Sequence, residues 1–325
     1  MSLFDIECTE EESSVVITPV NWEVTTSYGG GTSLAPDQIR EASVQIDHFS
    51  AKYPTHNSPK YFLRECNDAI LKSSQTNQKK AQEVYETSPE DKPELLKQVN
   101  EASEALNDWV YQETKKTLEK GKIAGSLGGD HSIPYGAIKA ISEKHEEFSI
   151  LHIDAHHDFR EAYFGFTHSH ASIFYNVMKS DFAPNKLVQV GIRDYCQEEY
   201  DFAKKDNRIS VFYDTDTSEK LLSGQQTWLD ICHEITSKLN QKVYISFDID
   251  GLEPALCPGT GTPVPGGLNF SQWQFLLDHL IHKKHQIIGF DLVEVASLEG
   301  SDFDANIGMR ILYGLCRACD LTKDF

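Results

Sequence analysis

The 325-residue sequence is 39% hydrophobic, enough for a sizeable core, and its 50 Asp and Glu against 30 Lys and Arg give a net charge of −20. Such an acidic chain is not expected to bind nucleic acid or an anionic membrane, and it suits a cationic substrate. Length alone allows one large domain or two. Because no segment of the sequence resembles a linker, we predict a single domain over residues 1–325.

The N-terminal third is predicted to be irregular at first and then helical. Residues 1–35 contain a glycine-rich polar loop and no clear element, and residues 36–51 are expected to form a helix. Residues 76–120 are polar, with apolar residues at helical spacing from Leu95 to Val110. We predict that residues 76–120 form an exposed helical insertion, either a solvated helical hairpin or a contact surface.

From residue 122 onward, short apolar runs alternate with helix-like segments such as 134–147 and 271–284. Continuous apolar strands between helices indicate a parallel sheet covered on both faces. We therefore predict an α/β fold with a three-layer α/β/α architecture and a doubly wound, mainly parallel sheet. The expected strands are 122–129, 148–155, 186–192, 208–213, 242–250 and 286–295.

Signals for localisation favour the cytoplasm. No apolar run reaches the roughly 18 residues of a transmembrane helix, and the acidic segment 1–14 lacks the apolar stretch of a secretory signal. The seven scattered cysteines suit a reducing compartment. Cys316 and Cys319 form a C-x-x-C pattern, but no second pair accompanies them, so we expect both on a buried helix face.

Four of the predicted strands end in His and carboxylate side chains. Ligands of a doubly wound sheet bind beyond the carboxyl ends of its strands, so these side chains are expected near one site. A single buried His or Asp is usually a satisfied polar residue, but unpaired burial of so many would be very costly. The four segments are GGDHS at 128–132, DAHHD at 154–158, SFDIDG at 246–251 and GFDLVEV at 289–295.

Spacing decides which of these side chains converge. Alternate residues of an extended chain share a face, so DAHHD presents three side chains together and turns His157 the other way, beside the site or at the surface. Two metal ions about 3.5–4 Å apart would use six ligands and activate water for hydrolysis. A set without Cys favours Mn²⁺, with Ni²⁺, Co²⁺ or Fe²⁺ as alternatives. The six predicted ligands are His131, Asp154, His156, Asp158, Asp248 and Asp250.

These segments resemble the ureohydrolase family, which includes arginase, agmatinase, guanidinobutyrase, proclavaminate amidinohydrolase and formimidoylglutamase. The resemblance covers roughly residues 120–325 and includes SFDIDGLEPALCPGTGTPVPGG at 246–267. It implies a doubly wound α/β fold, a homo-oligomer (trimer or hexamer), and two Mn²⁺ with a hydroxide that attacks a guanidinium carbon. It also implies that His131, Asp154, Asp158 and Asp248 bind one ion, and that Asp154, His156, Asp248 and Asp250 bind the other.

The resemblance implies catalytic roles for three residues around the ions. Glu294 matches the glutamate that pairs with the guanidinium group. His170 matches the histidine that shuttles protons, a role that suits a pKa near neutral. Asp158 is expected to act in catalysis as well as in metal binding. Glu253 stands where the family usually has a third aspartate in its second metal loop, but that position is not a ligand, so the ions should be retained.

The loop at 159–166 resembles the agmatinase branch of the family. Its aromatic residues and Glu161 suit an aliphatic amine tail, whereas Arg160 could pair with a substrate carboxylate, as in guanidinobutyrate. His168 is a further substrate-binding candidate beside the pocket. We therefore expect a small cationic guanidino substrate, with agmatine cleaved to urea and putrescine. Arginase, guanidinobutyrase or formimidoylglutamase activity is the alternative, and a non-catalytic metal-binding homologue is a second class.

Overall fold

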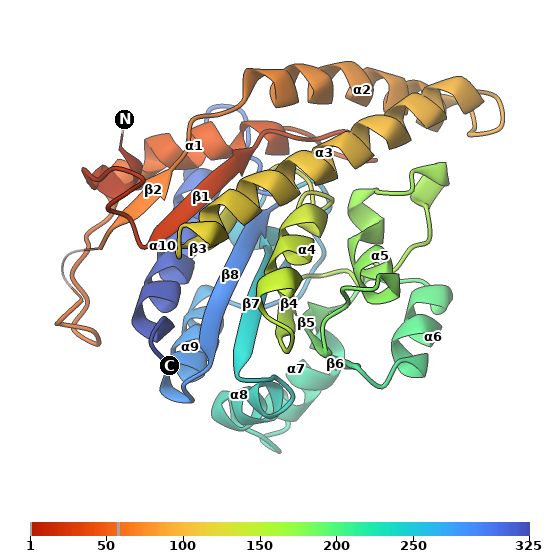
Figure 1. Cartoon of the computed structure of the whole chain (residues 1–325). Coiled ribbons are helices and arrows are strands. Elements are labelled where there is room, and N and C mark those ends of the chain that lie inside the picture. The colour runs from red at the N-terminus through yellow and green to blue at the C-terminus, as the bar shows by residue number, and fades with distance from the viewer. Residues whose placement is uncertain (1, 57–58) are drawn as a thin grey trace.

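The computed structural model describes residues 2–56 and 59–325. Its strands are β1 (Val15–Val20), β2 (Tyr61–Leu63), β3 (Ile123–Gly128), β4 (Ser149–Ile153), β5 (Lys186–Ile192), β6 (Ile209–Tyr213), β7 (Lys242–Asp248) and β8 (Gln286–Val293). They form one sheet in the order β2-β1-β3-β8-β7-β4-β5-β6 (Figure 1), and every neighbouring pair is parallel.

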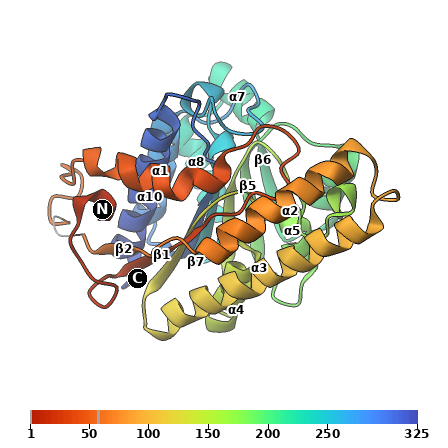
Figure 2. The same ribbon diagram turned by 90° about the horizontal axis from the view of Figure 1, so that it is seen from above.

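Helices cover both faces of this sheet, so the predicted three-layer α/β/α fold is confirmed (Figure 2). Apolar side chains alternate along the strands: Leu151 and Ile153 of β4 pack on one helical layer, and Ile150 packs on the other. One layer contains α1 (Ala35–Ala42), α8 (Trp228–Ser237), α9 (Phe270–His282) and α10 (Phe303–Thr322). The other contains α3 (Pro93–Glu119), α4 (Tyr135–Lys144) and α5 (Ile173–Lys179), with α2 (Asp68–Glu86) packed on α3. The remaining helices are α6 (Gln197–Lys205) and α7 (Asp214–Leu222).

Two elements near the N-terminus differ from the prediction. The segment expected to be irregular contains β1, whose six residues are all buried inside the sheet. Pro19 lies within β1, and a proline is usually confined to positions where its missing N–H is not needed. Because β2 pairs only with Val15 to Ile17, one side of β1 is unpaired at Pro19. The predicted helix at 36–51 is shorter than expected, since α1 ends at Ala42 and a 3₁₀ turn follows.

The predicted insertion at 76–120 is a helical hairpin of α2 and α3, which lie side by side in Figures 1 and 2. It begins earlier than predicted, because the Asn67 side chain accepts the Ala69 N–H at 2.9 Å and caps α2. Its inner face is not solvated: Val99, Leu106 and Val110 of α3 are buried against neighbouring elements. The hairpin therefore contributes to the core of the protein.

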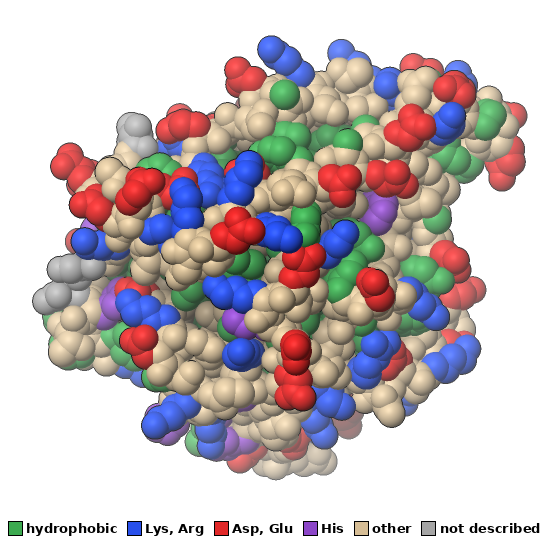
Figure 3. All heavy atoms as spheres, viewed as in Figure 1, with side chains coloured by type: hydrophobic (Ala, Val, Ile, Leu, Met, Phe, Trp, Pro, Cys, Tyr) green, Lys and Arg blue, Asp and Glu red, His purple; other side chains and the backbone are tan. Residues whose placement is uncertain are grey.

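The cysteines agree with the prediction from sequence, whereas the face drawn in Figure 3 carries both signs of charge. In Figure 3, carboxylates and basic side chains are interspersed over one face of the molecule. The seven cysteines are free, and Cys316 and Cys319 are buried on α10, as the helical spacing predicted. Within residues 2–56 and 59–325, no helix has the length and apolarity to cross a bilayer.

Candidate metal centre

The strand order brings the four segments that carry the predicted His and carboxylate side chains to one edge of the sheet. We call these side chains the metal-type cluster. β3, β8, β7 and β4 are consecutive in the sheet and parallel, so their carboxyl ends lie side by side. After β4 the chain adds β5 and β6 on one side and then returns to place β7 on the other side. Such a reversal of strand order leaves a crevice at the carboxyl ends, which is the usual ligand site of this architecture.

His131 lies at the centre of the cluster and is almost fully buried. Its Nδ1 atom faces carboxylate oxygens of Asp154, Asp158 and Asp248 at 3.0, 3.1 and 3.2 Å. Its Nε2 atom lies 2.9 Å from the Ser246 hydroxyl, which donates to Asp291 at 2.9 Å. Because that hydroxyl gives its proton to Asp291, it accepts the Nε2–H of His131, and the Nδ1 lone pair is left facing three carboxylates. Either a proton on Nδ1 or a metal ion satisfies this arrangement, and the donor set of imidazole and carboxylates fits a metal ion.

His156 forms a second group on the other side of Asp154. Its Nδ1 atom lies 3.1 Å from Asp250 and 3.4 Å from Asp154. The two groups therefore share Asp154, as expected for a carboxylate that bridges two ions. Asp248 contacts His131 and accepts the Asp250 N–H at 2.8 Å. The structure thus brings all six predicted ligands together.

His152 belongs to the cluster and was missed in the sequence. Its Nε2 atom lies 2.7 Å from Asp154, and its Nδ1 atom accepts from the Gln189 amide at 2.9 Å. Both ring nitrogens are thus engaged, so His152 orients Asp154 instead of offering a free ligand atom. His152 lies two residues before Asp154, on the same face of the strand. Extending the alternation by one step would have identified it.

His157 points away from the metal-type cluster, as the alternation predicted. It is fully buried, so the surface alternative is wrong. Its Nδ1 atom lies 2.7 Å from Gln189, and its ring stacks on Phe159 at a centroid distance of 5.2 Å. Gln189 thereby contacts His157 and His152 at once and fixes the segment that carries Asp154 and His156.

The buried carboxylates of the cluster repel one another. Burial, and then the charge of Asp154, raises the pKa of Asp158 to about 7. Burial, followed by Asp250 and Asp154, raises the pKa of Asp248 well above its usual range. Asp158 and Glu294 also have left-handed backbones, with φ of 55° and 59°, which is strained for these residues. Divalent cations would offset the repulsion among these carboxylates.

We expect the free energy of unfolding of the metal-free protein to fall as pH rises above about 6.5. The folded state raises the pKa values of Asp158, Asp248 and His131, so it retains protons that the unfolded chain has released. His152 and His170, whose pKa values are lowered to about 4, add an opposing slope near pH 6.5, where an unfolded histidine is half protonated, and this slope fades as pH rises further.

Thermal melting with a chelator between about pH 6.5 and 8.5 measures this dependence. Excess Mn²⁺ should weaken or reverse it, because metal competes with protons for the same atoms. Asp158→Asn should give a shallower decline. A melting temperature that rises with pH in the presence of chelator would contradict the prediction.

A cavity of ≈ 200 Å³ opens above the cluster. Glu294 lines it, and its carboxylate accepts the His131 N–H at 2.8 Å. Burial, and then Asp130, raises the pKa of Glu294 well above its usual range. His170 also lines the cavity, but burial, followed by His156 and His131, lowers its pKa to about 4. The expected near-neutral pKa of His170 is therefore not found in this environment.

Of the three residues predicted to bind the substrate tail, the structure places one at the cavity and two away from it. Arg160 lines the cavity, with its Nε atom 3.8 Å from Glu199 and its guanidinium over the Tyr163 ring. The structure does not bring Glu161 or His168 to the cavity: Glu161 is exposed, and His168 packs against Tyr135. In this loop Ala162 and Phe164 have positive φ values of 47° and 51°. Tyr163, one of the loop aromatics expected to contact the substrate tail, lines the cavity. Sequence reasoning missed other lining residues: Ser27, Asp194, Tyr195, Glu199 and Thr262.

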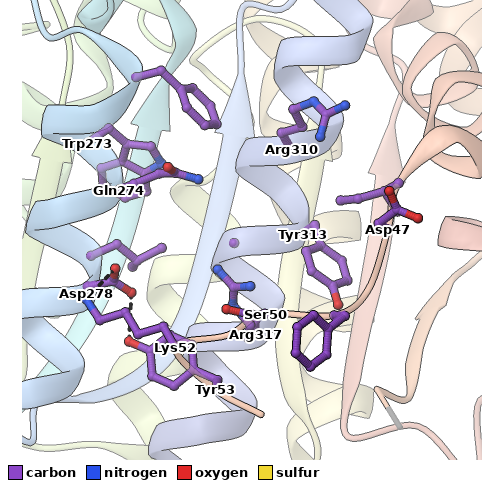
Figure 4. Close-up of a pocket in the computed structure, with 15 residues that line it drawn as sticks. Asp47, Ser50, Lys52, Tyr53, Trp273, Gln274, Asp278, Arg310, Tyr313 and Arg317 are labelled. Atoms are coloured by element: carbon purple, nitrogen blue, oxygen red, sulfur yellow. Dashed lines mark hydrogen bonds and ion pairs between the residues drawn. The ribbon is translucent and has the colours of Figure 1, made fainter. Parts of the chain in front are cut away.

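A second cavity, of ≈ 300 Å³, lies beside α9 and α10 (Figure 4). Figure 4 shows Asp278 facing Lys52 and Tyr53, which bind it at 2.7 Å each. Arg317 lies between Tyr53 and Tyr313, with its guanidinium over both rings. The described lining contains no histidine, and one of its two carboxylates is already paired. This cavity therefore lacks the donor set of the cluster at the strand ends.

Comparisons with known proteins agree with this geometry. A model of the Arginase family matches residues 13–316. The N(1)-aminopropylagmatine ureohydrolase of Synechocystis sp. is 31% identical over 291 residues, 89% of this chain and 84% of that protein. The agmatinase of Bacillus anthracis is 31% identical over 292 residues, 88% of this chain and 84% of that protein. The solved agmatine ureohydrolase of Thermoplasma volcanium has a TM-score of 0.74 at 24% identity, covers 99% of this chain and 95% of that one, and so shares the fold.

Proposed function

This chain belongs to the arginase family and is a ureohydrolase of the agmatinase type, and from that premise we propose that it hydrolyses agmatine to urea and putrescine. The observation that carries the proposal is the convergence of His131, Asp154, His156, Asp158, Asp248 and Asp250 beneath one cavity. Hydrolysis of N1-aminopropylagmatine is the second candidate, because relatives of this name are as similar to the chain as the agmatinases are.

The residues present fit two divalent cations, and we propose Mn²⁺ because the donors are carboxylates and imidazoles. Asp154 and Asp248 would contribute ligands to both ions, and His131 and His156 would bind one each. When bound, the two ions would supply a water of lowered pKa as the nucleophile for hydrolysis. The chain's own contribution is to hold the six donors in place, through Ser246 and Asp291 behind His131 and through His152 and Gln189 behind Asp154.

Two further residues are proposed to act on the substrate. The Glu294 carboxylate would pair with the guanidinium group, whose positive charge would lower the raised pKa of Glu294 and keep it ionised. His170 is neutral at pH 7, so its imidazole can accept a proton and then deliver it to the leaving amine. Thr25 lies 3.4 Å from Nδ1 of His170 and accepts its backbone N–H at 3.1 Å, which fixes the ring beside the cavity.

Specificity for an amine tail is proposed to come from the mouth of the cavity. Tyr163 and Tyr195 supply aromatic walls, and Asp194 supplies a carboxylate at the end of β5. Arg160 lies beside Glu199 and over Tyr163, so its charge is partly offset and need not attract a substrate carboxylate. This combination favours a cationic tail over the carboxylate tail of guanidinobutyrate or arginine.

Urea release from a substrate panel tests the proposed function. Purified protein loaded with Mn²⁺ should release urea from agmatine or N1-aminopropylagmatine with kcat/KM at least ~10-fold above that for arginine or guanidinobutyrate. Asp194→Asn should raise KM for the amine substrate by only ~2–5-fold, because the Asp194 side chain is 69% exposed and well solvated. Protein that binds metal but releases urea from no member of the panel would refute the proposal and favour a non-catalytic homologue.

We also propose that residues 1–325 act as one catalytic domain, that the protein assembles into a homo-oligomer (trimer or hexamer) and that it works in the cytoplasm. The single sheet and the seven free cysteines support the first and the last of these proposals. Analytical ultracentrifugation of the metal-loaded protein tests the assembly.

A further inference from the structure

The helical hairpin of α2 and α3 contacts both chain segments that wall the cavity. One wall is the segment at 21–34, which carries Thr25 and Ser27, and the other is the loop at 159–170, which carries Tyr163 and His170. These contacts come from side chains of the hairpin that lie far from the metal-type cluster in sequence. The hairpin therefore supports the walls of the cavity from outside the metal-type cluster.

The first wall is held by α2. The Ser74 hydroxyl accepts the backbone N–H of Glu23 at 2.8 Å, and the Gln78 amide donates to the Glu23 carboxylate at 3.3 Å. That carboxylate in turn accepts the N–H groups of Gly31 and Ser33 at 2.8 and 3.0 Å. Glu23 is buried, so these bonds are shielded from water.

The second wall is held by α3. The Asn100 amide donates to the carbonyl of Gly165 at 3.1 Å, and its oxygen accepts the N–H of Thr167 at 3.0 Å. Gly165 has a φ of 80° and lies against Leu96, so its own backbone fits only a small residue. One side chain of the hairpin thus binds the loop on both sides of Phe166.

Tyr85 of α2 contacts both walls at once. Its hydroxyl donates to the carbonyl of Thr25 at 2.6 Å. Its ring packs against Phe164 and Phe166 at centroid distances of 4.9 and 5.3 Å, and against Tyr163 at 6.5 Å. Thr25 lies beside His170, and Tyr163 lies beside the same imidazole with the two rings 6.1 Å apart. Tyr85 is therefore connected to His170 in two ways, once through Thr25 and once through Tyr163.

We propose that Tyr85 is a positioning residue of this enzyme: it locks the Thr25 segment to the 159–170 loop and thereby fixes His170 and Tyr163 at the cavity. The proposal rests on the proposed function for its catalytic consequence, but the positioning itself does not depend on which substrate is used. It gives the hairpin a defined role, because Tyr85 holds the two walls only while α2 is packed on α3.

Three variants test the proposal. Tyr85→Phe removes the bond to Thr25 and keeps the ring, Tyr85→Leu removes both, and Tyr111→Phe is the matched control. Tyr111 lies on α3, where its hydroxyl donates to Glu143 at 2.7 Å, away from the cavity. If Tyr85→Leu does not fold, Tyr85→Phe decides the test, since the two side chains have nearly the same shape.

The first readout is hydrogen–deuterium exchange, which needs no turnover. Peptides covering 21–34 and 159–170 should exchange faster in Tyr85→Phe, and faster still in Tyr85→Leu, whereas Tyr111→Phe should match the wild type. Unchanged exchange in both peptides would overturn the proposal whatever the activity. Because exchange is measured on protein without substrate, this result stays distinct from a failure of the proposed function, which shows as a wild type that releases no urea.

The second readout separates kcat from KM with the best substrate of the panel. Tyr85→Phe should lower kcat by ~5–10-fold, the effect of one lost hydrogen bond, with the metal content unchanged. Tyr85→Leu should lower kcat by ~30-fold or more, because His170 and Tyr163 both lose their support. A variant with faster exchange but unchanged kcat would also overturn the proposal, because the walls would then be mobile without consequence.

Discussion

Asp248→Asn should lose urea release and metal retention together. Asp248 faces Nδ1 of His131 at 3.2 Å and accepts the N–H of Asp250, so asparagine keeps its shape but removes one negative charge from the centre of the cluster. Metal ions contribute several kcal/mol of transition-state stabilisation, so kcat should fall by at least ~10³-fold. Measuring bound Mn²⁺ by mass spectrometry beside urea release tests both losses in the same sample.

The same substitution should have the opposite effect on the metal-free fold. Burial and the charges of Asp250 and Asp154 disfavour ionised Asp248, so asparagine relieves repulsion when no cation is present. With chelator, Asp248→Asn should melt at a higher temperature than the wild type, and with Mn²⁺ the order should reverse. Asp278→Asn, in the second cavity, is the matched control and should change neither metal content nor this order. A variant that keeps both metal and turnover would remove Asp248 from the proposed ligands.

The part of the site that the sequence predicted depends on one rule of geometry. Alternation along an extended chain separated His156, which joins Asp154 and Asp250, from His157, which packs on Phe159. The same rule includes His152, which we did not predict because its neighbours made it look like part of an apolar strand. Alternation places His152 on the face of Asp154, but its role as a support and not a ligand follows only from its contact with Gln189 of β5.

Other features of the site depend on contacts that no local pattern encodes. Glu161 was predicted to face the substrate, but it is exposed, and Tyr163 two residues later lines the cavity. Tyr85 and Thr25 are 60 residues apart, and only the packing of α2 on α3 brings them together. In the fold, β1 contains Pro19, a residue that strands tolerate only where its N–H is not needed, and only the short partner β2 shows that this condition is met.

Glu294→Gln should retain the metal ions and lose the substrate. Glu294 lies at the end of β8, and its carboxylate accepts the His131 N–H, a bond that the glutamine oxygen can keep. Glutamine cannot supply the negative charge that a buried guanidinium requires. Loss of one partner from a buried charge pair costs about 3–5 kcal/mol, so kcat/KM should fall by ~10²–10⁴-fold while the Mn²⁺ content remains that of the wild type.

Inhibition by guanidinium ion separates this role from a structural one. The ion carries the group that Glu294 is proposed to hold and no tail, so it should compete with substrate in the wild type and lose that effect in Glu294→Gln. Asp194→Asn is the control, since a residue that reads the tail should leave guanidinium inhibition unchanged. If Glu294→Gln were inhibited as strongly as the wild type, the carboxylate would not pair with the guanidinium group. Its raised pKa would then reflect only its burial beside Asp130.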